Sequence, residues 1–304
     1  MERPYYIVDA FTNERFAGNA AAIVLDAEGL TEEQMQSIAA EFNLSETTFV
    51  LPPESDRSSM RFRWFTPTVE VTMCGHATIG GIAALIEAGR VQRDDSSSCP
   101  SACIDTLSGR LTVFVETAPD DRGSRIIWLD MPTPVLNECP LSGSDWAPVL
   151  NLPTDAFDAA LPAARTQDLD ALVFVKDFLT LSQARPDFAA LRDLQIRHEL
   201  RGLCLSTVST LTPAITAQSR FFAPSVGIDE DPVTGSVHGP LAAYIASRGL
   251  APTDEGTAAL MCTQGKAGGR AGVVYALVKL DNDAARSVRI GGQAVVVMCG
   301  TLFV

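Results

Sequence analysis

Two stretches of this chain, far apart in the sequence, follow the same plan. The first reads Phe-Thr-Pro at 65–67 and Cys-Gly-His-Ala-Thr at 74–78. The second reads Phe-Ala-Pro at 222–224 and Thr-Gly-Ser-Val-His at 234–238, after a loop that is three residues longer. Each copy predicts a strand, a proline turn, a loop, and a helix that begins at the glycine. The repeat therefore predicts a duplicated domain.

The helix in each copy is expected to lie at the centre of its domain. Apolar side chains occupy nearly every face of residues 76–88 and of the matching run that ends at Gly249. A helix that is apolar all round is buried rather than laid on a surface. Strands that wrap around each helix would make two similar, barrel-like domains.

Another helix is expected before the first copy. Thr31 and Gln34 stand at the spacing of a capping box, in which each side chain bonds the backbone of the other residue. This pattern predicts a helix from about Glu32 to Phe42.

The length of 304 residues agrees with two domains. The polar stretch 117–124 is the best boundary, so we expect one domain over 1–118 and a second over 119–294. The last run, 295–304, is strand-rich, and we expect it to pack back on the first domain.

The net charge of −14 argues against nucleic acid and anionic membranes as partners. The N-terminus lacks the basic and apolar segments of a signal peptide, and no apolar run is long enough to span a bilayer. Seven scattered cysteines fit a reduced, cytoplasmic setting. A small anionic metabolite remains a suitable partner, because one cleft can be locally positive.

The two predicted helix N-termini suit an anionic substrate. Backbone N–H groups at a helix start bind carboxylates, and Gly235 and the hydroxyl of Ser236 stand at the start of the second helix. A cleft between the two copies would hold the anion from both sides.

Two of the three histidines, His76 and His238, fall in the first turns of the paired helices. A helix N-terminus lowers the pKa of a histidine, so both are expected to be neutral. They are either polar caps that face solvent or functional groups, and the position of His76 inside the repeated motif favours function. Asp231 starts a turn before the second helix, and it either caps that turn or points a carboxylate at the substrate.

Cys74 stands at the start of the first helix, where a thiolate would be stabilised. This suggests a racemase, since cofactor-free racemases use two facing cysteines, one from each domain. Thr234 occupies the matching position in the second copy and cannot serve as the opposing thiolate. The repeat itself therefore disfavours the two-cysteine mechanism.

Neither a cofactor nor a metal is expected. No Gly-x-Gly-x-x-Gly follows a strand, so a dinucleotide has no support. The three lysines lie outside the two helix-start motifs, which argues against a pyridoxal Schiff base. Cys99 and Cys103 have no partner pair at zinc spacing.

Several strings of residues match a known family. They are Val8–Thr12, Phe16–Asn19, Glu41–Thr47, Phe65–Pro67, Gly75–Thr78 and Glu230–Ser236. In these strings the chain resembles the PhzF family, the phenazine-biosynthesis-like isomerases. The resemblance implies the α+β fold of diaminopimelate epimerase, in which two similar domains each wrap a mixed, mostly antiparallel sheet around a central helix, with the site in the cleft between them.

The resemblance also implies the chemistry. Family members are cofactor-independent and often homodimeric, and the catalytic glutamate matches Glu46, assisted by residues that match His76, Asp231 and Ser236. Glu46 would take a proton from the substrate and return it elsewhere, which requires a pKa nearer the working pH than that of a free glutamate. The residues expected to line the substrate site are Asn19, Cys74, Gly75, Ala77, Thr78, Gly235 and His238.

The sequence leaves three hypotheses about the function of the protein. The first is a cofactor-free isomerase that uses Glu46 as base and acid on a small carboxylate-bearing metabolite. The second is an amino-acid racemase or epimerase that uses Cys74. The third is a non-catalytic protein that binds a small ligand. A non-catalytic protein would have no physical reason to keep an acid, an imidazole and a second acid on separate segments, and this argues against the third hypothesis.

Overall fold

The computed structural model describes residues 2–91, 100–118, 124–266 and 268–304. It divides into two compact units: unit 1 comprises Met1–Asp130 and Gly291–Val304, and unit 2 comprises Met131–Ile290. The sequence places the boundaries at 118/119 and 294/295. Residues 119–123, on which the first of these falls, lie outside the described residues, as does Cys99.

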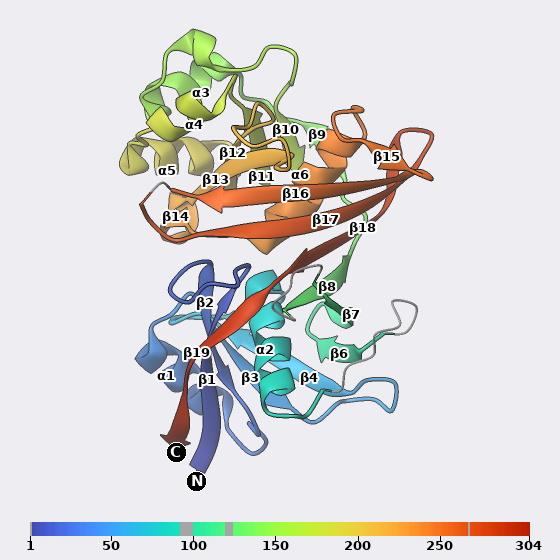
Figure 1. The fold of residues 1–304 in the computed structure, drawn as a ribbon. Coiled ribbons are helices and arrows are strands. Elements are labelled where there is room, and N and C mark those ends of the chain that lie inside the picture. Colours follow the sequence, from blue (N-terminus) through green and yellow to red (C-terminus); the bar gives the residue numbers. More distant parts are fainter. Residues whose placement is uncertain (1, 92–99, 119–123, 267) are drawn as a thin grey trace. The chain divides into compact units, whose positions relative to one another are not determined.

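Unit 1 surrounds one buried helix with strands. Its elements are β1 (Glu2–Ala10), β2 (Asn19–Val24), α1 (Glu32–Phe42), β3 (Glu46–Leu51), β4 (Met60–Phe65), β5 (Glu70–Val71), α2 (Gly75–Glu87), β6 (Ala102–Thr106), β7 (Gly109–Thr117), β8 (Arg125–Met131) and β19 (Ala294–Phe303). All residues of α2 from Gly75 to Ile82 are buried, and the helix packs against β1, β2, β3 and β19 (Figure 1). The prediction of a central helix is confirmed.

The strands of unit 1 pair in a mixed pattern. β19 runs antiparallel to β1, and β1 antiparallel to β2. β2 and β3 are parallel, β3 and β4 antiparallel, and β4 and β6 parallel. β6, β7 and β8 then follow antiparallel to one another. The last strand of the chain therefore lies beside the first.

A second central helix, α6, lies in unit 2. The elements of this unit are β9 (Leu136–Glu138), α3 (Gly143–Leu150), η1 (Thr154–Ala156), β10 (Ala164–Thr166), β11 (Asp170–Phe174), α4 (Phe178–Gln183), α5 (Phe188–Arg197), β12 (Gly202–Thr207), β13 (Ala217–Ala223), η2 (Pro224–Val226), β14 (Ile228–Asp231), α6 (Gly235–Ala246), β15 (Thr253–Asp254), β16 (Thr257–Gly265), β17 (Ala271–Asp281) and β18 (Ala284–Gly292). All residues of α6 from Val237 to Ala246 are buried, and the helix packs against β16 and β17.

The strand pairing of unit 1 recurs in unit 2. β11 and β12 are parallel, β12 and β13 antiparallel, β13 and β16 parallel, and β16 and β17 antiparallel. These match β2, β3, β4, β6 and β7 in that order. Helices connect the parallel pair in both units, α1 in one and α4 with α5 in the other. The duplication that the sequence predicts is thus present in the topology.

Each copy also carries the same partly buried ion pair. Arg63 donates to both carboxylate oxygens of Glu70, with Nε and Oε1 2.6 Å apart, and Arg220 does the same to Glu230 at 2.7 Å. Each guanidinium lies over the phenylalanine ring two positions later, 5.1 and 4.9 Å from the centroid. The two arginines are separated in the sequence by the same number of residues as the two Phe-x-Pro triplets. The two glutamates are separated by the same number as the glycines that begin the two helices. The extra loop of the second copy therefore lies before Glu230, in the turn that contains η2.

Local sequence signals set the ends of the helices. Thr31 accepts a hydrogen bond from the backbone N–H of Gln34, and the Gln34 side chain accepts one from the N–H of Thr31. This capping box satisfies two N–H groups that the first turn of α1 would leave without partners. Gly89 and Gly249, which follow α2 and α6, have φ of +71° and +67°, a conformation that glycine adopts without strain.

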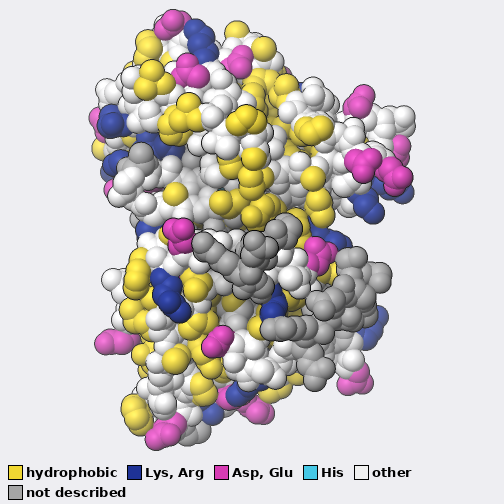
Figure 2. Space-filling view, in the orientation of Figure 1, with side chains coloured by type: hydrophobic (Ala, Val, Ile, Leu, Met, Phe, Trp, Pro, Cys, Tyr) yellow, Lys and Arg dark blue, Asp and Glu magenta, His cyan; other side chains and the backbone are white. Residues whose placement is uncertain are grey.

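Among the described residues, no helix is long and apolar enough to cross a membrane. On the face that Figure 2 shows, acidic and basic side chains are interspersed with apolar ones. Among the coloured residues on that face, the Lys and Arg side chains do not gather into a broad patch.

We expect the same substitution, glutamate to glutamine, to lower the free energy of unfolding by different amounts in the two ion pairs. Glu230→Gln would leave the Arg220 side chain, which is 4% exposed, without its charged partner. Glu70→Gln leaves Arg63 with a second carboxylate, Glu32, 2.7 Å from Nη2. We expect Glu230→Gln to lower the free energy of unfolding by about 3 kcal/mol and Glu70→Gln by clearly less. Urea denaturation of both variants measures the difference, and equal losses would contradict it.

Candidate active site

Glu46 and His76 meet at the start of the buried helix of unit 1. Glu46 is the first residue of β3 and His76 the second of α2. The Nε2 of His76 lies 3.1 Å from Oε2 of Glu46, and the two side chains are 7% and 15% exposed. The strand end and the helix start thus bring together a carboxylate and an imidazole from separate segments of the chain.

Burial lowers the pKa of His76 to about 4, so its imidazole is neutral near pH 7. The sequence predicts this neutrality from the helix N-terminus. In the structure its cause is the loss of solvent around the ring. A neutral imidazole can donate one hydrogen bond and accept another, which suits it to orienting a carboxylate.

Cys74 extends this cluster on the other side of the ring. Its Sγ lies 3.4 Å from Nδ1 of His76. Among the described residues, Glu46, Cys74 and His76 form a group with side-chain ligand atoms all within 4.8 Å of one another, as a metal site requires. The thiol and the carboxylate contact different ring nitrogens, so the three side chains also form a chain of polar contacts.

The other predicted residues of unit 1 lie around this cluster. Asn19 begins β2, whose residue Ala21 pairs with Glu46, so both side chains stand at the same end of two parallel strands. Gly75 is the first residue of α2. Ala77 and Thr78 are fully buried, and the Thr78 hydroxyl donates to the carbonyl of Cys74 at 2.6 Å. Thr78 therefore supports the helix start from inside.

In unit 2, Asp231 is held at the start of α6 by a hydroxyl and a carboxamide. Thr234 Oγ1 donates to Oδ2 of Asp231. Gln264, a buried residue of β16, donates from Nε2 to the carbonyl of Asp231 at 2.8 Å and to Thr234 Oγ1 at 3.1 Å. The Oε1 of Gln264 accepts from the backbone N–H of Thr234 at 3.1 Å. These bonds fix the loop that carries Asp231.

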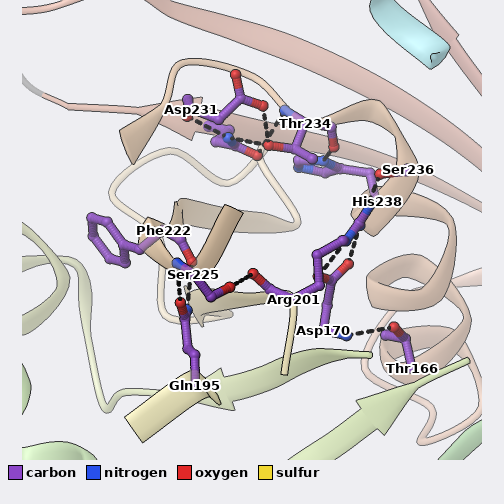
Figure 3. Close-up of polar contacts among 11 residues, drawn as sticks. Thr166, Asp170, Gln195, Arg201, Phe222, Ser225, Asp231, Thr234, Ser236 and His238 are labelled. Atoms are coloured by element: carbon purple, nitrogen blue, oxygen red, sulfur yellow. Dashed lines mark hydrogen bonds and ion pairs between the residues drawn. The ribbon is translucent and has the colours of Figure 1, made fainter. Parts of the chain in front are cut away.

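Ser236, the second residue of α6, contacts a guanidinium (Figure 3). Arg201 Nη2 lies 3.3 Å from Ser236 Oγ, while Nε and Nη2 of Arg201 donate to the two carboxylate oxygens of Asp170. The Arg201 side chain is 36% exposed and that of Asp170 only 1%. Burial opposes the charge on Arg201, but the bonds from Asp170 raise the pKa of the guanidinium overall.

Arg201, Asp170 and Gln264 are not among the residues that the sequence singles out. Arg201 and Asp170 are 31 residues apart and become neighbours because β11 and β12 are parallel, with Asp170 opposite Gly202. The available signal is a charged residue placed directly before an apolar strand in each case. Gln264 lies within a strand and gives no such signal.

The sequence predicts that His238 lines the substrate site, but its side chain has no exposed surface. Its Nδ1 lies 2.8 Å from the carbonyl of Thr234 and its Nε2 3.4 Å from Oγ of Ser219. The contact to Thr234 repeats the bond from Thr78 to Cys74 in the other copy, four residues along each helix. His238 therefore supports the helix start from inside, and burial lowers its pKa to about 4.

The strand registers show which positions correspond. Thr47 pairs with Phe65, and Leu203 with Phe222, so Glu46 corresponds to Gly202, the neighbour of Arg201. Counted from the first residue of each helix, His76 corresponds to Ser236 and Cys74 corresponds to Thr234. One copy thus presents a carboxylate, an imidazole and a thiol, and the other presents a guanidinium and hydroxyls. The first set can move protons, and the second can bind an anion.

Comparison with known proteins identifies the family that the chain matches. The model of the PhzC-PhzF family, described as "Phenazine biosynthesis-like protein", matches residues 8–300. The chain is 37% identical to an uncharacterized isomerase of Pseudomonas aeruginosa, over 99% of both chains. It is 33% identical to the uncharacterized isomerase YddE of Escherichia coli K12, over 97% of both.

Solved structures show the same fold. A PhzF-family phenazine biosynthesis protein of Bacillus anthracis matches 100% of both chains, with a TM-score of 0.87 and 28% identity. A hydroxyproline epimerase of Agrobacterium vitis, solved with bound trans-4-hydroxy-L-proline, matches 99% of this chain and 92% of its own. Its TM-score is 0.64 and its identity 12%, so this likeness concerns the fold alone.

The buried histidines predict acid sensitivity. Their pKa values are about 4 in the folded chain against 6.5 for free histidine, so the unfolded chain binds more protons between these values. Each contribution to stability is present above pH 6.5 and lost as the pH falls towards 4, by about 3 kcal/mol per histidine.

His238→Gln should reduce this loss. We expect the difference in unfolding free energy between wild type and His238→Gln to shrink as the pH falls through that window, measured by urea denaturation across the range. A difference that stays constant with pH would contradict the prediction.

Proposed function

The chain belongs to the PhzC-PhzF family of phenazine biosynthesis-like proteins, and from this premise we propose that it catalyses a cofactor-free proton shift. The substrate is a small, carboxylate-bearing metabolite, and Glu46 is the base that takes the proton and the acid that returns it. The two relatives named above are called uncharacterized isomerases, which agrees with a reaction that only rearranges the substrate.

The observation that carries this proposal is the contact of 3.1 Å between Glu46 Oε2 and the neutral imidazole of His76. Contact with a neutral imidazole orients the carboxylate without adding a positive charge that would hold it ionised. A group in this setting can accept a proton and give it back.

Side chains of the second unit are proposed to hold the substrate. Ser236 and Gly235 offer a hydroxyl and the N–H groups of the α6 N-terminus to a carboxylate. Asp231, fixed by Thr234 and Gln264, is proposed to contact the substrate and share its proton.

Arg201 joins the proposed carboxylate site. Its Nε and Nη2 donate to Asp170, and Nη2 also lies 3.3 Å from Ser236 Oγ. The Arg201 side chain is 36% exposed. A planar guanidinium held in one orientation matches the geometry of a carboxylate. We propose that Arg201 selects substrates that carry a carboxylate.

The racemase hypothesis finds less support. Thr234 stands where a second cysteine would be needed, and its hydroxyl already donates to Asp231. An alcohol does not ionise near neutral pH, so Thr234 cannot act as the opposing base.

Glu46→Gln tests the proposed base. In heavy water, the wild type should introduce deuterium into at least one member of a panel of cyclic and amino-acid carboxylates. Glu46→Gln should lose this uptake by a factor of about 10² or more. Mass spectrometry of the recovered compounds measures it, and Glu41→Gln, at an exposed site on α1, is the matched control. Full uptake by Glu46→Gln would sink the proposal.

Arg201→Gln tests the carboxylate site. For any compound that exchanges, we expect KM to rise by about tenfold, which is the loss of about 1.4 kcal/mol of binding, while kcat changes less. Arg197→Gln, at an exposed site on α5, should leave both constants unchanged. Steady-state kinetics decide it, and a fall confined to kcat would argue against a binding role.

A further inference from the structure

Cys74, His76 and Glu46 form a line of three groups that each can carry a proton. The thiol contacts Nδ1 at 3.4 Å, and the carboxylate lies 3.1 Å from Nε2 of the same ring. The Cys74 and His76 residues are buried and the Glu46 side chain nearly so. Catalytic contacts of this kind are often long before substrate binds and shorten when it does.

The protonation of the ring follows by elimination. The 3.1 Å contact between His76 and Glu46 is not a hydrogen bond as the two side chains stand. A carboxylate can only accept, so a hydrogen bond from His76 to an ionised Glu46 requires the hydrogen on Nε2. A neutral imidazole has one hydrogen, so Nδ1 is then an acceptor and the S–H of Cys74 is the donor to it. When Glu46 is protonated, Nε2 can accept, and the ring hydrogen can move to Nδ1, facing the sulfur.

The second copy lacks this chain at the same positions. Thr234 replaces the thiol, Ser236 replaces the imidazole and Gly202 replaces the carboxylate. The shared backbone thus does not require the chain, and its three members occur together in the copy that carries the proposed base. This points to a role in proton transfer rather than in folding.

We propose that Cys74 is the proton reserve of Glu46, linked to it through His76. In the transfer, the S–H bond breaks as an Nδ1–H bond forms, and the Nε2–H bond breaks as an Oε2–H bond forms. The cluster changes from thiol and carboxylate to thiolate and carboxylic acid, with the same number of protons and no added reagent. Cys74 is the N-cap of α2, where the positive end of the helix dipole favours a thiolate.

This reserve deepens the proposed function, on which it rests, by letting Glu46 begin a cycle as an acid. With a single base, Glu46 must first take a proton from the substrate before it can donate one. With the Cys74 proton available, the enzyme can protonate the substrate first and recover a proton from it afterwards.

The tautomer of His76 is the first test, and it needs no substrate. In protein labelled with ¹⁵N-histidine, the three histidines are assigned by single substitution. His238 is an internal reference, because Nδ1 faces a carbonyl and must carry its hydrogen. We expect the opposite tautomer, Nε2–H, for His76. Finding Nδ1–H on His76 at neutral pH would overturn the proposal.

The coupling of thiol and carboxylate is the second test. The Cβ resonance of Cys74, assigned with Cys74→Ser, is followed against pH in the wild type, Glu46→Gln, His76→Gln and the double variant. We expect Glu46→Gln to shift the titration of Cys74, and most of that shift to disappear when His76 is also replaced. A shift of equal size without His76 would mean that the two groups interact only through space, and would overturn the proposal.

A Cys74 signal that does not titrate before the protein unfolds would also overturn the proposal. Cys299→Ser, at an exposed site on β19, is the control for cysteine replacement and should change neither readout. Both tests use the free protein. The proton chain can therefore fail while Glu46-dependent deuterium uptake persists, or hold while no uptake is found.

Discussion

The burial of one apolar helix in each unit is the constraint on which the rest of the structure depends. α2 and α6 present apolar side chains on nearly every face, so strands must cover them from several sides. The first turn of such a helix is buried along with the rest. Polar residues placed there, His76 and His238, lose their solvent and stay neutral. The same packing that forms the core thus sets the protonation state of the candidate site.

The duplicated backbone carries two different sets of side chains. Both copies keep the arginine–glutamate pair, the glycine that follows the helix, and a polar side chain that bonds the carbonyl four residues earlier. They differ where the helix start meets the neighbouring strand, at Glu46 and His76 in one copy and at Gly202 and Ser236 in the other. The contacts that both copies share stabilise the fold. The positions at which the copies differ are those for which we propose a role in catalysis or substrate binding.

Sequence reasoning predicts the features that are encoded locally. The capping box of Thr31 and Gln34, the two buried helices and the repeat itself all lie within short windows, and each is confirmed. Arg201 and Asp170 escape such reasoning because parallel strand pairing, which no local pattern specifies, brings them together. The orientation of the His238 side chain cannot be predicted for a related reason. The sequence shows that His238 lies in the first turn of the helix, but the direction of its side chain depends on what packs around the helix.

The pairing of β19 with β1 has a consequence for synthesis. Unit 1 takes its last strand, Ala294–Phe303, from the end of the chain, whereas unit 2 is continuous over Met131–Ile290. Because residues leave the ribosome in sequence order, all of unit 2 emerges before the strand that covers β1 and α2. The domain that begins first therefore closes last, and the edge of β1 stays open until Ala294–Phe303 has emerged.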